Sequence, residues 1–304
     1  MSEKKAMKKV SIALCTFNGE KYLKEQLDSI LQQDYEAIDE IVCVDDCSTD
    51  STWQILTDYS LLHPTIKIFK NTENIGYIKN FEKAIALTTN EFIALSDQDD
   101  IWHPSKVRKL IHAIKQKPMV YSDNEYVDEN ANPLNRFSSD FRHLAKSNNC
   151  LNFSFFNVIS GHTAMINRSL FELSKPFPTD LPFDNWLAFR ASLIGQVGYV
   201  NESLVRYRQH ANNTLSGKAE TEAERIRNTY KRLKCLAAHT PAAKFLREKK
   251  ALEALAKSYH DRSFGNRQRR VGVFLKFNKE ILHFRKRNKL SKFIYSFKMF
   301  WKYI

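Results

Sequence analysis

Glycine, proline and cysteine are scarce in this chain of 304 residues, which contains only 8 Gly, 8 Pro and 5 Cys. So few Gly and Pro exclude collagen-like and low-complexity chains, and a hydrophobic content of 43% against 27% charged residues excludes general disorder. No apolar run reaches 18 residues, so the sequence predicts no membrane-spanning helix. The cysteines are odd in number and lack paired metal-site spacing, which favours reduced thiols in a cytosolic compartment.

Negative charge is almost absent from the end of the chain. Residues 267 to 304 hold twelve Lys or Arg and a single acid, Glu280, so this tail carries +11 of the formal net charge of +13. Apolar residues recur in the tail at helical spacing: Phe274, Phe277, Ile281, Phe284, Phe293, Phe297, Phe300 or Trp301, and Ile304. A basic amphipathic helix of this kind can bind an anionic membrane surface. The alternative is that the stripe packs on the rest of the protein or on a second subunit.

The first 120 residues alternate short β-rich runs with helical periodicity. The predicted strands are Val10–Thr16, Glu40–Asp45, Ile66–Phe69 and Phe92–Leu95. Repeated strand-helix-strand units predict an α/β fold, with a mostly parallel central sheet and flanking helices. We expect one domain over residues 1–217, with loops and an irregular insertion at 124–157, and a helical C-terminal region over 218–304 in which Pro241 marks a break.

Helix boundaries also follow from the sequence. Ser48 or Asp50 can cap the helix that follows the second strand, and Pro104 suits the first turn of a later helix. That later helix places Val107, Leu110, Ile111 and Ile114 on one face, at the spacing i, i+3, i+4, i+7.

Polar clusters follow three of the predicted strands: Thr16–Asn18, Asp45–Asp46 and Asp97–Asp100. Ligands of open α/β sheets bind beyond the carboxyl ends of the strands, so we expect the three clusters to meet at one site. Crowded carboxylates need a cationic partner, and Mg²⁺ typically uses one or two carboxylates together with substrate phosphates. The alternative is a solvated turn at each acidic cluster, with Asp100 capping the next helix.

Four segments taken in order resemble the family 2 glycosyltransferases of the GT-A fold: Val10–Gly19, Val44–Thr52, Asn74–Gly76 and Asp97–Asp100. The resemblance covers roughly residues 8 to 215. One departure is Cys15, which stands where many members have Pro or Thr. A backbone contact at this position would survive the change, whereas a side-chain contact would not.

The resemblance implies a set of donor-binding residues: Cys15, Thr16, Phe17, Asn18, Asp45, Asp46, Asn74, Gly76, Asp97 and Arg208. Asp46 is the position matched to base recognition. The Asp-x-Asp element, matched by Asp97 and Asp99, implies Mg²⁺ or Mn²⁺ on the donor diphosphate.

Two later segments extend the resemblance. Pro182–Trp186 is similar to the acidic site that supplies the family's catalytic base, which implies that role for Asp184; Asp184 could instead cap a helix starting at Asn185. Leu204–Asn213 is similar to the Tyr-Arg-x-His element of bacterial rhamnosyltransferase-like members. There His210 could ligate the metal and Arg208 could contact the diphosphate, the alternative being a structural imidazole. His162, Asn185 and Trp186 are candidate acceptor contacts.

The implied activity is an inverting transfer to a hydroxyl of a growing, lipid-linked cell-surface polysaccharide. The donor is L-rhamnose from dTDP-rhamnose or a hexose from a UDP-sugar. The resemblance implies a cytoplasmic enzyme, peripheral on the cytoplasmic face of the membrane through its tail. One alternative is a nucleotidyltransferase, which usually carries a Gly- and Lys/Arg-rich segment near the first strand. Another is a non-enzymatic protein that binds nucleic acid or membrane; because the positive charge is concentrated in a tail, we expect no nucleic acid partner.

Overall fold

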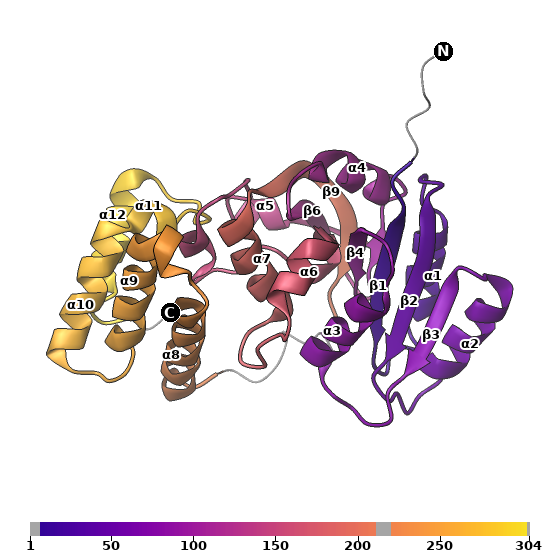
Figure 1. Ribbon diagram of the computed structural model, residues 1–304, viewed down its shortest axis with the longest axis horizontal. Coiled ribbons are helices and arrows are strands. Elements are labelled where there is room, and N and C mark those ends of the chain that lie inside the picture. Colours follow the sequence, from indigo (N-terminus) through magenta and orange to yellow (C-terminus); the bar gives the residue numbers. More distant parts are fainter. Residues whose placement is uncertain (1–6, 211–219, 303–304) are drawn as a thin grey trace, which may run out of the picture.

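A computed structural model describes residues 7–210 and 220–302. Within these residues, nine strands form one sheet in which eight follow the order β3-β2-β1-β4-β8-β6-β9-β5, and β7 pairs with β6 (Figure 1). The strands are β1 Val10–Thr16, β2 Ile38–Asp45, β3 Ile66–Lys70, β4 Phe92–Ser96, β5 Ile101–Trp102, β6 Met119–Val127, β7 Pro133–Phe137, β8 Ala164–Asn167 and β9 Val197–Arg208. The four strands predicted from the sequence are therefore confirmed.

The sheet is parallel in one half and mixed in the other. Strands β3, β2, β1 and β4 are all parallel, whereas β8 runs antiparallel to both β4 and β6. The prediction of an α/β fold is confirmed, and the parallel arrangement that it specified holds for the first four strands. In register, Thr16 lies opposite Asp45 and Leu14 opposite Ser96, so the loops after β1, β2 and β4 begin at one edge.

Amphipathic helices cover both faces of the sheet. These helices are α1 Leu23–Leu31, α2 Thr52–Leu62, α3 Tyr77–Leu87 and α4 Lys106–Ile114. The four apolar residues predicted to face inward from α4 are all buried, in one cluster with residues of α1 and α2. Residues of α3 belong to a second cluster. Burial of these apolar faces is the main contribution that fixes the helices on the sheet.

The predicted starts of two helices need correction. Helix α2 begins after Ser51, which makes no side-chain cap, although Asp50 Oδ1 accepts a hydrogen bond from the backbone N–H of Thr52 (3.0 Å). Helix α4 begins at Lys106 with Ser105 at its N-cap, so Pro104 lies just before the helix.

Residues 124–157 are more regular than predicted. Strand β6 continues to Val127 and pairs with β7, the short helix α5 spans Ser138–Phe141, and a 3-10 helix spans Cys150–Phe153. The polar residues Ser122, Asp123 and Asn124 conceal the strand in the sequence, because all three are buried within it. Asp123 Oδ1, for example, accepts hydrogen bonds from the backbone N–H groups of Asn124 and Ser139 (2.8 and 3.2 Å).

The remaining helices extend the molecule away from β3 (Figure 1). They are α6 Arg168–Ser174, α7 Phe183–Ile194, α8 Glu222–Ala238, α9 Ala242–Ser258, α10 Phe264–Lys276, α11 Asn278–Ile281 and α12 Lys289–Lys298. Pro241 is the N-cap of α9, which agrees with the predicted break. The proposed domain boundary at 217/218 lies outside the described residues.

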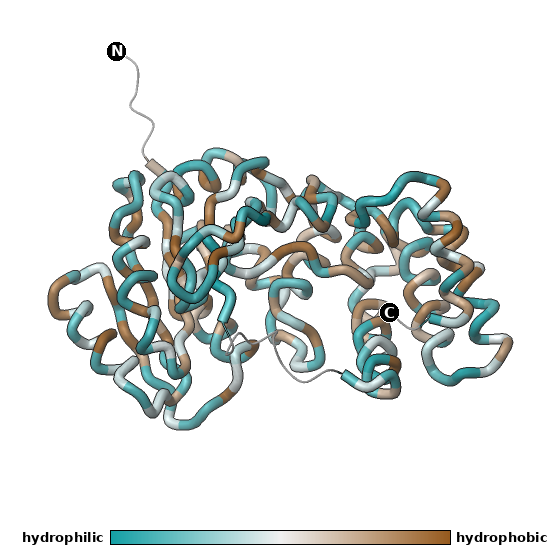
Figure 2. The backbone as a smooth tube through the Cα atoms, turned by 180° about the vertical axis from the view of Figure 1, so that it is seen from behind, coloured by the Kyte–Doolittle hydropathy of each residue, from teal (hydrophilic) through white to brown (hydrophobic). Residues whose placement is uncertain are grey.

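The C-terminal helices share a hydrophobic core with the rest of the chain. Phe274, Phe277, Ile281 and Phe284 are buried together with residues of α7 and the 3-10 helix. In Figure 2, hydrophobic segments occur both in the strands and in these helices. For these four residues, the alternative that the stripe packs on the protein is confirmed. Ile304 lies outside the described residues. None of the described helices has the length and hydropathy needed to cross a bilayer.

Candidate active site

The loop after β1 is held against the loop after β4 by Gln98. Gln98 Oε1 accepts a hydrogen bond from the backbone N–H of Phe17 (2.8 Å), and its Nε2 donates to the carbonyl of Phe17 (3.0 Å). A Cβ on Gly19 would lie 2.3 Å from Gln98 Oε1, so a larger residue at this position would push the Gln98 amide away from Phe17. The predicted clusters at Thr16–Asn18 and Asp97–Asp100 therefore do meet, with the Phe17 ring exposed beside them.

The carboxylates of Asp45, the last residue of β2, and of Asp46 are buried and form hydrogen bonds within the protein. Asp45 Oδ1 accepts from Thr16 Oγ1 (3.0 Å), and its Oδ2 accepts from the backbone N–H of Ser48 (3.0 Å). Asp46 is 2% exposed; its Oδ1 accepts from Asn71 Nδ2 (2.7 Å) and from the Ile75 N–H (2.9 Å), and its Oδ2 accepts from the Gly76 N–H (2.9 Å). Asp46 thus fixes the segment that carries Asn74 and Gly76.

Cys15 contributes its backbone to this edge, since its thiol is buried in the core. All five cysteines carry free thiols, as the sequence predicted.

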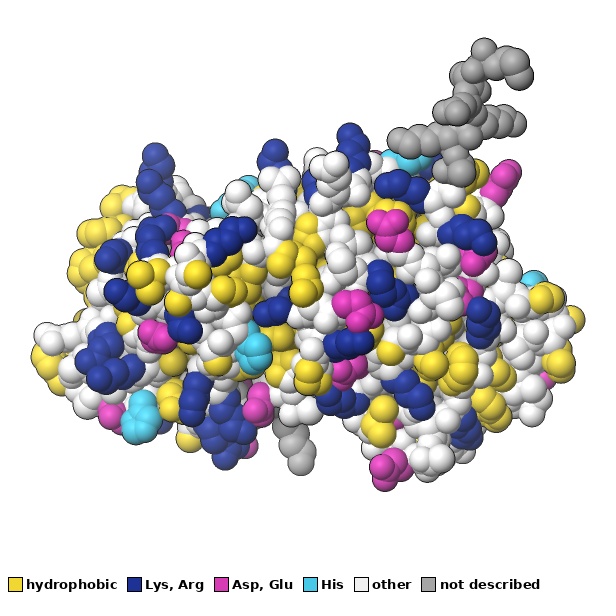
Figure 3. Space-filling model, viewed as in Figure 1, with side chains coloured by type: hydrophobic (Ala, Val, Ile, Leu, Met, Phe, Trp, Pro, Cys, Tyr) yellow, Lys and Arg dark blue, Asp and Glu magenta, His cyan; other side chains and the backbone are white. Residues whose placement is uncertain are grey.

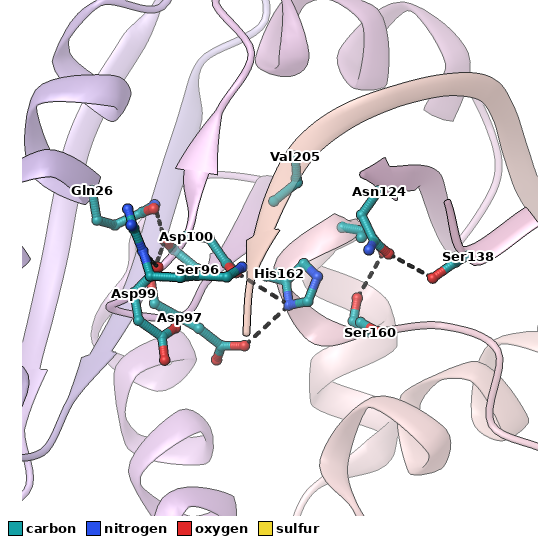
Figure 4. A network of polar contacts seen from close by, with 12 residues as sticks. Gln26, Ser96, Asp97, Asp99, Asp100, Asn124, Ser138, Ser160, His162 and Val205 are labelled. Carbon is teal, nitrogen blue, oxygen red and sulfur yellow. Dashed lines mark hydrogen bonds and ion pairs between the residues drawn. The ribbon is translucent and has the colours of Figure 1, made fainter. Parts of the chain in front are cut away.

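The acidic loop after β4 contacts two histidines, and Figure 4 shows the first of them, His162, beside Asp97 and Asp100. His162 Nδ1 lies 3.2 Å from Asp97 Oδ2 and 3.3 Å from Asp100 Oδ2. His210, two residues after the end of β9, places its Nε2 2.9 Å from Asp99 Oδ2. The structure therefore pairs the predicted metal ligands Asp99 and His210, and it groups Asp97 with Asp100 and His162.

Burial and mutual repulsion perturb the charges in this loop. Burial, together with Asp99 and Asp97, raises the pKa of Asp100 to about 7, against the opposing effect of His162. Burial and then Asp97 raise the pKa of Asp99. Burial lowers the pKa of His162, but Asp100 and Asp97 outweigh it, so the net shift is upward. Such shifts mark a site where negative charge is concentrated and poorly solvated.

The residues of this loop fit a divalent cation. One ligand atom each from Asp97, Asp100 and His162 lie within 4.8 Å of one another. His162 Nε2 is buried, and no group in the described ranges forms a hydrogen bond with it. Carboxylate oxygens with an imidazole suit Mg²⁺ or Mn²⁺, and Asp99 with His210 supplies a second pair of the same kind.

Arg208 requires a correction, because it does not face an open donor site. It is 1% exposed; its Nε donates to the carbonyl of Asp99 (2.9 Å), and its remaining nitrogens contact the Glu129 carbonyl and the Glu25 carboxylate. Its own backbone N–H donates to Asp100 Oδ1 (3.2 Å). The structure thus gives Arg208 a role in holding the acidic loop in place of the predicted contact with diphosphate.

Asp184 lies in the first turn of α7. Its Oδ1 accepts hydrogen bonds from the backbone N–H of Asn185 (2.6 Å) and from Asn157 Nδ2 (2.8 Å). Burial and Asp97 raise the pKa of Asp184 to about 6, although these two hydrogen bonds oppose the shift. Because α7 begins at Phe183, Asp184 is not the N-cap that the alternative interpretation required. A carboxylate with a pKa near 6 is suited to accept a proton near neutral pH.

The three candidate acceptor residues are buried. Asn185 Nδ2 donates to the carbonyl of Phe153 (3.2 Å) and Trp186 Nε1 to the carbonyl of Ser174 (2.8 Å), so both side chains point into the core. His162 is 3% exposed and belongs to the acidic loop's contacts. These predictions are corrected, because side chains packed in this way do not reach an acceptor.

Sequence reasoning missed three residues of the site. Gln98 and Asn157 are described above. The third is Tyr77, which is 41% exposed at the start of α3. Burial, and then the charges of Asp184 and Asp97, raise the pKa of Tyr77 to about 12. The position of Gln98 inside the acidic motif was a usable signal, whereas the sequence around Asn157 offered none.

The fold and the site together define an α/β transferase of the GT-A class. The same fold occurs in the solved structure of Staphylococcus aureus TarS, residues 1–349, in complex with UDP-GlcNAc, with a TM-score of 0.62 and 18% identity, over 95% of this chain and 89% of that one. The family model of glycosyl transferase family 2 matches residues 11–173. The chain belongs to glycosyl transferase family 2.

Curated relatives agree with this assignment. An uncharacterized glycosyltransferase of Haemophilus influenzae is 28% identical over 218 residues, which is 68% of this chain and 67% of the relative. The putative teichuronic acid biosynthesis glycosyltransferase TuaG of Bacillus subtilis is 26% identical, over 75% of this chain and 89% of the relative. The dTDP-rhamnosyl transferase RfbG of Shigella flexneri is 28% identical, over 72% of this chain and 78% of the relative.

Proposed function

We propose that this chain catalyses an inverting transfer from a nucleoside-diphosphate sugar to an acceptor hydroxyl, with Asp184 as general base. The observation that carries the proposal is the pairing of two features. Asp184 has a pKa raised to about 6, and the loop Asp97–Asp100, which fits a cation, is close enough for Asp97 to contribute to that shift. General-base catalysis needs a carboxylate that is ionised at working pH and still basic enough to accept a proton.

In this proposal, each group of residues has a separate role. Asp184 takes the proton of the acceptor hydroxyl as that oxygen attacks the anomeric carbon. Asp97 with Asp100 and His162, beside the pair formed by Asp99 and His210, would hold Mg²⁺ or Mn²⁺, which would supply positive charge for the leaving diphosphate. The exposed Phe17 ring and the segment Asn74–Gly76 lie where the donor's nucleoside would bind, and Asp45 and Asp46 keep the surrounding loops in shape.

The proposed donor is dTDP-rhamnose or a UDP-hexose. The similarity to a dTDP-rhamnosyl transferase supports the first, and the fold shared with a protein crystallised with UDP-GlcNAc is compatible with the second. The acceptor is a growing cell-surface polysaccharide, which the similarity to a teichuronic acid glycosyltransferase supports.

We also propose that α12 docks on an anionic membrane, which would bring the enzyme to a lipid-linked acceptor at the cytoplasmic face. Leu290, Phe293, Ile294, Phe297 and Trp301 form its apolar face, with exposures between 46% for Phe297 and 70% for Trp301. Exposed cations surround this face: Lys286, Arg287, Lys289, Lys298 and Lys302. Figure 3 shows hydrophobic and basic side chains together at this end of the molecule. This combination matches a headgroup layer of negative charge above an apolar interior.

The test of the activity is nucleoside-diphosphate release from a panel of nucleotide sugars, with Mg²⁺ or Mn²⁺ and with a chelator. We expect metal-dependent release from one donor. If no donor is bound or turned over, with acceptor lipids present, the proposed function is wrong.

A further inference from the structure

Asn157 is a polar residue of the site to which the sequence motifs assign no role. It lies between the 3-10 helix Cys150–Phe153 and the second 3-10 helix, Gly161–Thr163. Its side chain makes two hydrogen bonds in opposite directions: Nδ2 donates to Asp184 Oδ1 (2.8 Å), and Oδ1 accepts from the backbone N–H of Ile159 (3.1 Å). The amide therefore has a fixed orientation, since a flipped amide would lose both bonds.

Both donors that reach Asp184 use the same carboxylate oxygen. The Asn185 N–H and Asn157 Nδ2 both donate to Oδ1, and no hydrogen bond to Oδ2 occurs among the described residues. We propose that Asn157 is a positioning residue for Asp184, holding Oδ1 so that Oδ2 is left to take the acceptor's proton. This inference rests on the proposed role of Asp184 as the base.

The C-terminal helices hold Asn157 in place. The guanidinium of Arg142 donates to the carbonyl of Asn157. The backbone of Arg142 forms an isolated antiparallel β-bridge with that of Arg285, which follows α11. The guanidinium of Arg285 lies 4.4 Å above the ring of Phe156, the neighbour of Asn157. The His143 N–H donates to the carbonyl of Phe284 (2.9 Å). The segment that carries Asn157 is thus clamped between the catalytic half and the C-terminal helices.

The groups around Asp184 set its pKa, and this pKa provides the measure of what the loss of Asn157 does. The charges of Asp97, in the loop after β4, and of His162, in the second 3-10 helix, act on Asp184, and the charge of Asp184 acts on Tyr77 in α3. Asp97 raises the pKa of Asp184, while His162 and Asn157 lower it. Removing Asn157 takes away a donor that favours the ionised carboxylate, so the pKa of Asp184 should rise further.

The experiment compares the full-length wild type with Asn157→Ala and Asn157→Asp. The carboxyl of Asp184 is titrated by NMR on protein with ¹³C-labelled aspartate, assigned with Asp184→Asn. We expect the midpoint to rise by on the order of one pH unit in Asn157→Ala, and by more in Asn157→Asp, where a second carboxylate faces Asp184. Turnover should fall several-fold more at pH 6.5 than at pH 8.5, while affinity for UDP or dTDP with Mg²⁺ stays within about twofold of the wild type.

Asn149→Asp is the matched control, because it replaces an amide by a carboxylate in the same segment, as Asn157→Asp does. The Oδ1 of Asn149 accepts from the backbone N–H of Leu151, a bond that Asp can keep, and Asn149 does not contact Asp184. An unchanged Asp184 midpoint in both Asn157 variants would overturn the proposal, as would unfolding of both while Asn149→Asp folds. These outcomes are separate from failure of the proposed function, which would show as full turnover by Asp184→Asn.

Discussion

Two sets of carboxylates have opposite environments: Asp45 and Asp46 lie at the end of β2, whereas Asp99 lies in the loop after β4 and Asp184 in the first turn of α7. Asp45 and Asp46 are buried and satisfied by several donors each, which is the state of carboxylates that shape loops. Asp99 and Asp184 have pKa values raised first by burial, with a further contribution from Asp97. The difference shows that position after a strand does not decide a carboxylate's role; how far its charge is compensated does.

The largest expected effect is that of Asp184→Asn. If Asp184 is the base, turnover should fall on the order of 10²- to 10⁴-fold, because the general base is lost while the shape of the site is kept. Steady-state kinetics at pH 7.5 would measure the loss, and donor binding measured by calorimetry should stay near the wild-type value. Wild-type turnover by this variant would remove Asp184 from the mechanism.

The same variant should not be less stable. The pKa of Asp184 rises on folding from its ordinary value of 3.8 to about 6, so the folded state binds this proton more tightly than the unfolded state. Stability therefore falls as the pH rises through this window, and the penalty is complete above pH 6. At pH 7.5, Asp184→Asn should melt at or above the wild-type temperature in calorimetry, and a lower melting temperature would argue against this environment.

Asp99→Ala should act on donor binding. Loss of this carboxylate removes the partner of His210, and we expect metal-dependent nucleotide affinity to fall by at least 10- to 100-fold, a range typical of disturbed metal sites. Titration of UDP and dTDP with and without Mn²⁺ measures the change. Equal metal-dependent affinity in wild type and variant would contradict the assignment.

Asp46→Asn tests a carboxylate of the other set, whose hydrogen bonds are satisfied within the protein. An amide cannot accept all three hydrogen bonds that Asp46 receives, so we expect a loss of about 1–3 kcal/mol in the free energy of unfolding. Urea denaturation measures this loss. Full stability together with abolished nucleotide binding would instead place Asp46 among the direct donor contacts.

The smallest effect concerns α12 and leaves catalysis intact. Changing Phe293, Phe297 and Trp301 to Ser should weaken binding to anionic vesicles by at least about tenfold, since each aromatic contributes about 1.5–3 kcal/mol when fully buried. Co-sedimentation with vesicles measures it, and Leu61→Ser with Leu62→Ser, on the exposed face of α2, is the control. Deletion of residues 267–304 would be uninformative, because it removes the buried Phe274, Phe277, Ile281 and Phe284. Equal vesicle binding by both variants would refute the docking proposal.

The sequence predicts the fold and the location of the site because strand periodicity and polar clusters at strand ends are local signals. Burial of individual side chains depends on tertiary contacts, so the sequence did not predict which polar and aromatic side chains are buried. Arg208 sits in a motif typical of anion contacts, yet β9 carries it beneath the acidic loop to Glu25. Phe274 and Phe297 belong to the same helical repeat of apolar residues in the sequence, although Phe274 is buried and Phe297 is exposed.

The most direct test of the central claim is the anomeric configuration of the first product formed from the accepted donor. This product is the free sugar when water is the nucleophile and the glycosylated acceptor when the acceptor is, and ¹H NMR follows its formation. A single displacement assisted by Asp184 predicts that the configuration is inverted relative to the donor. Retention of the donor's configuration would contradict the account, because it would require a different course of reaction at this site.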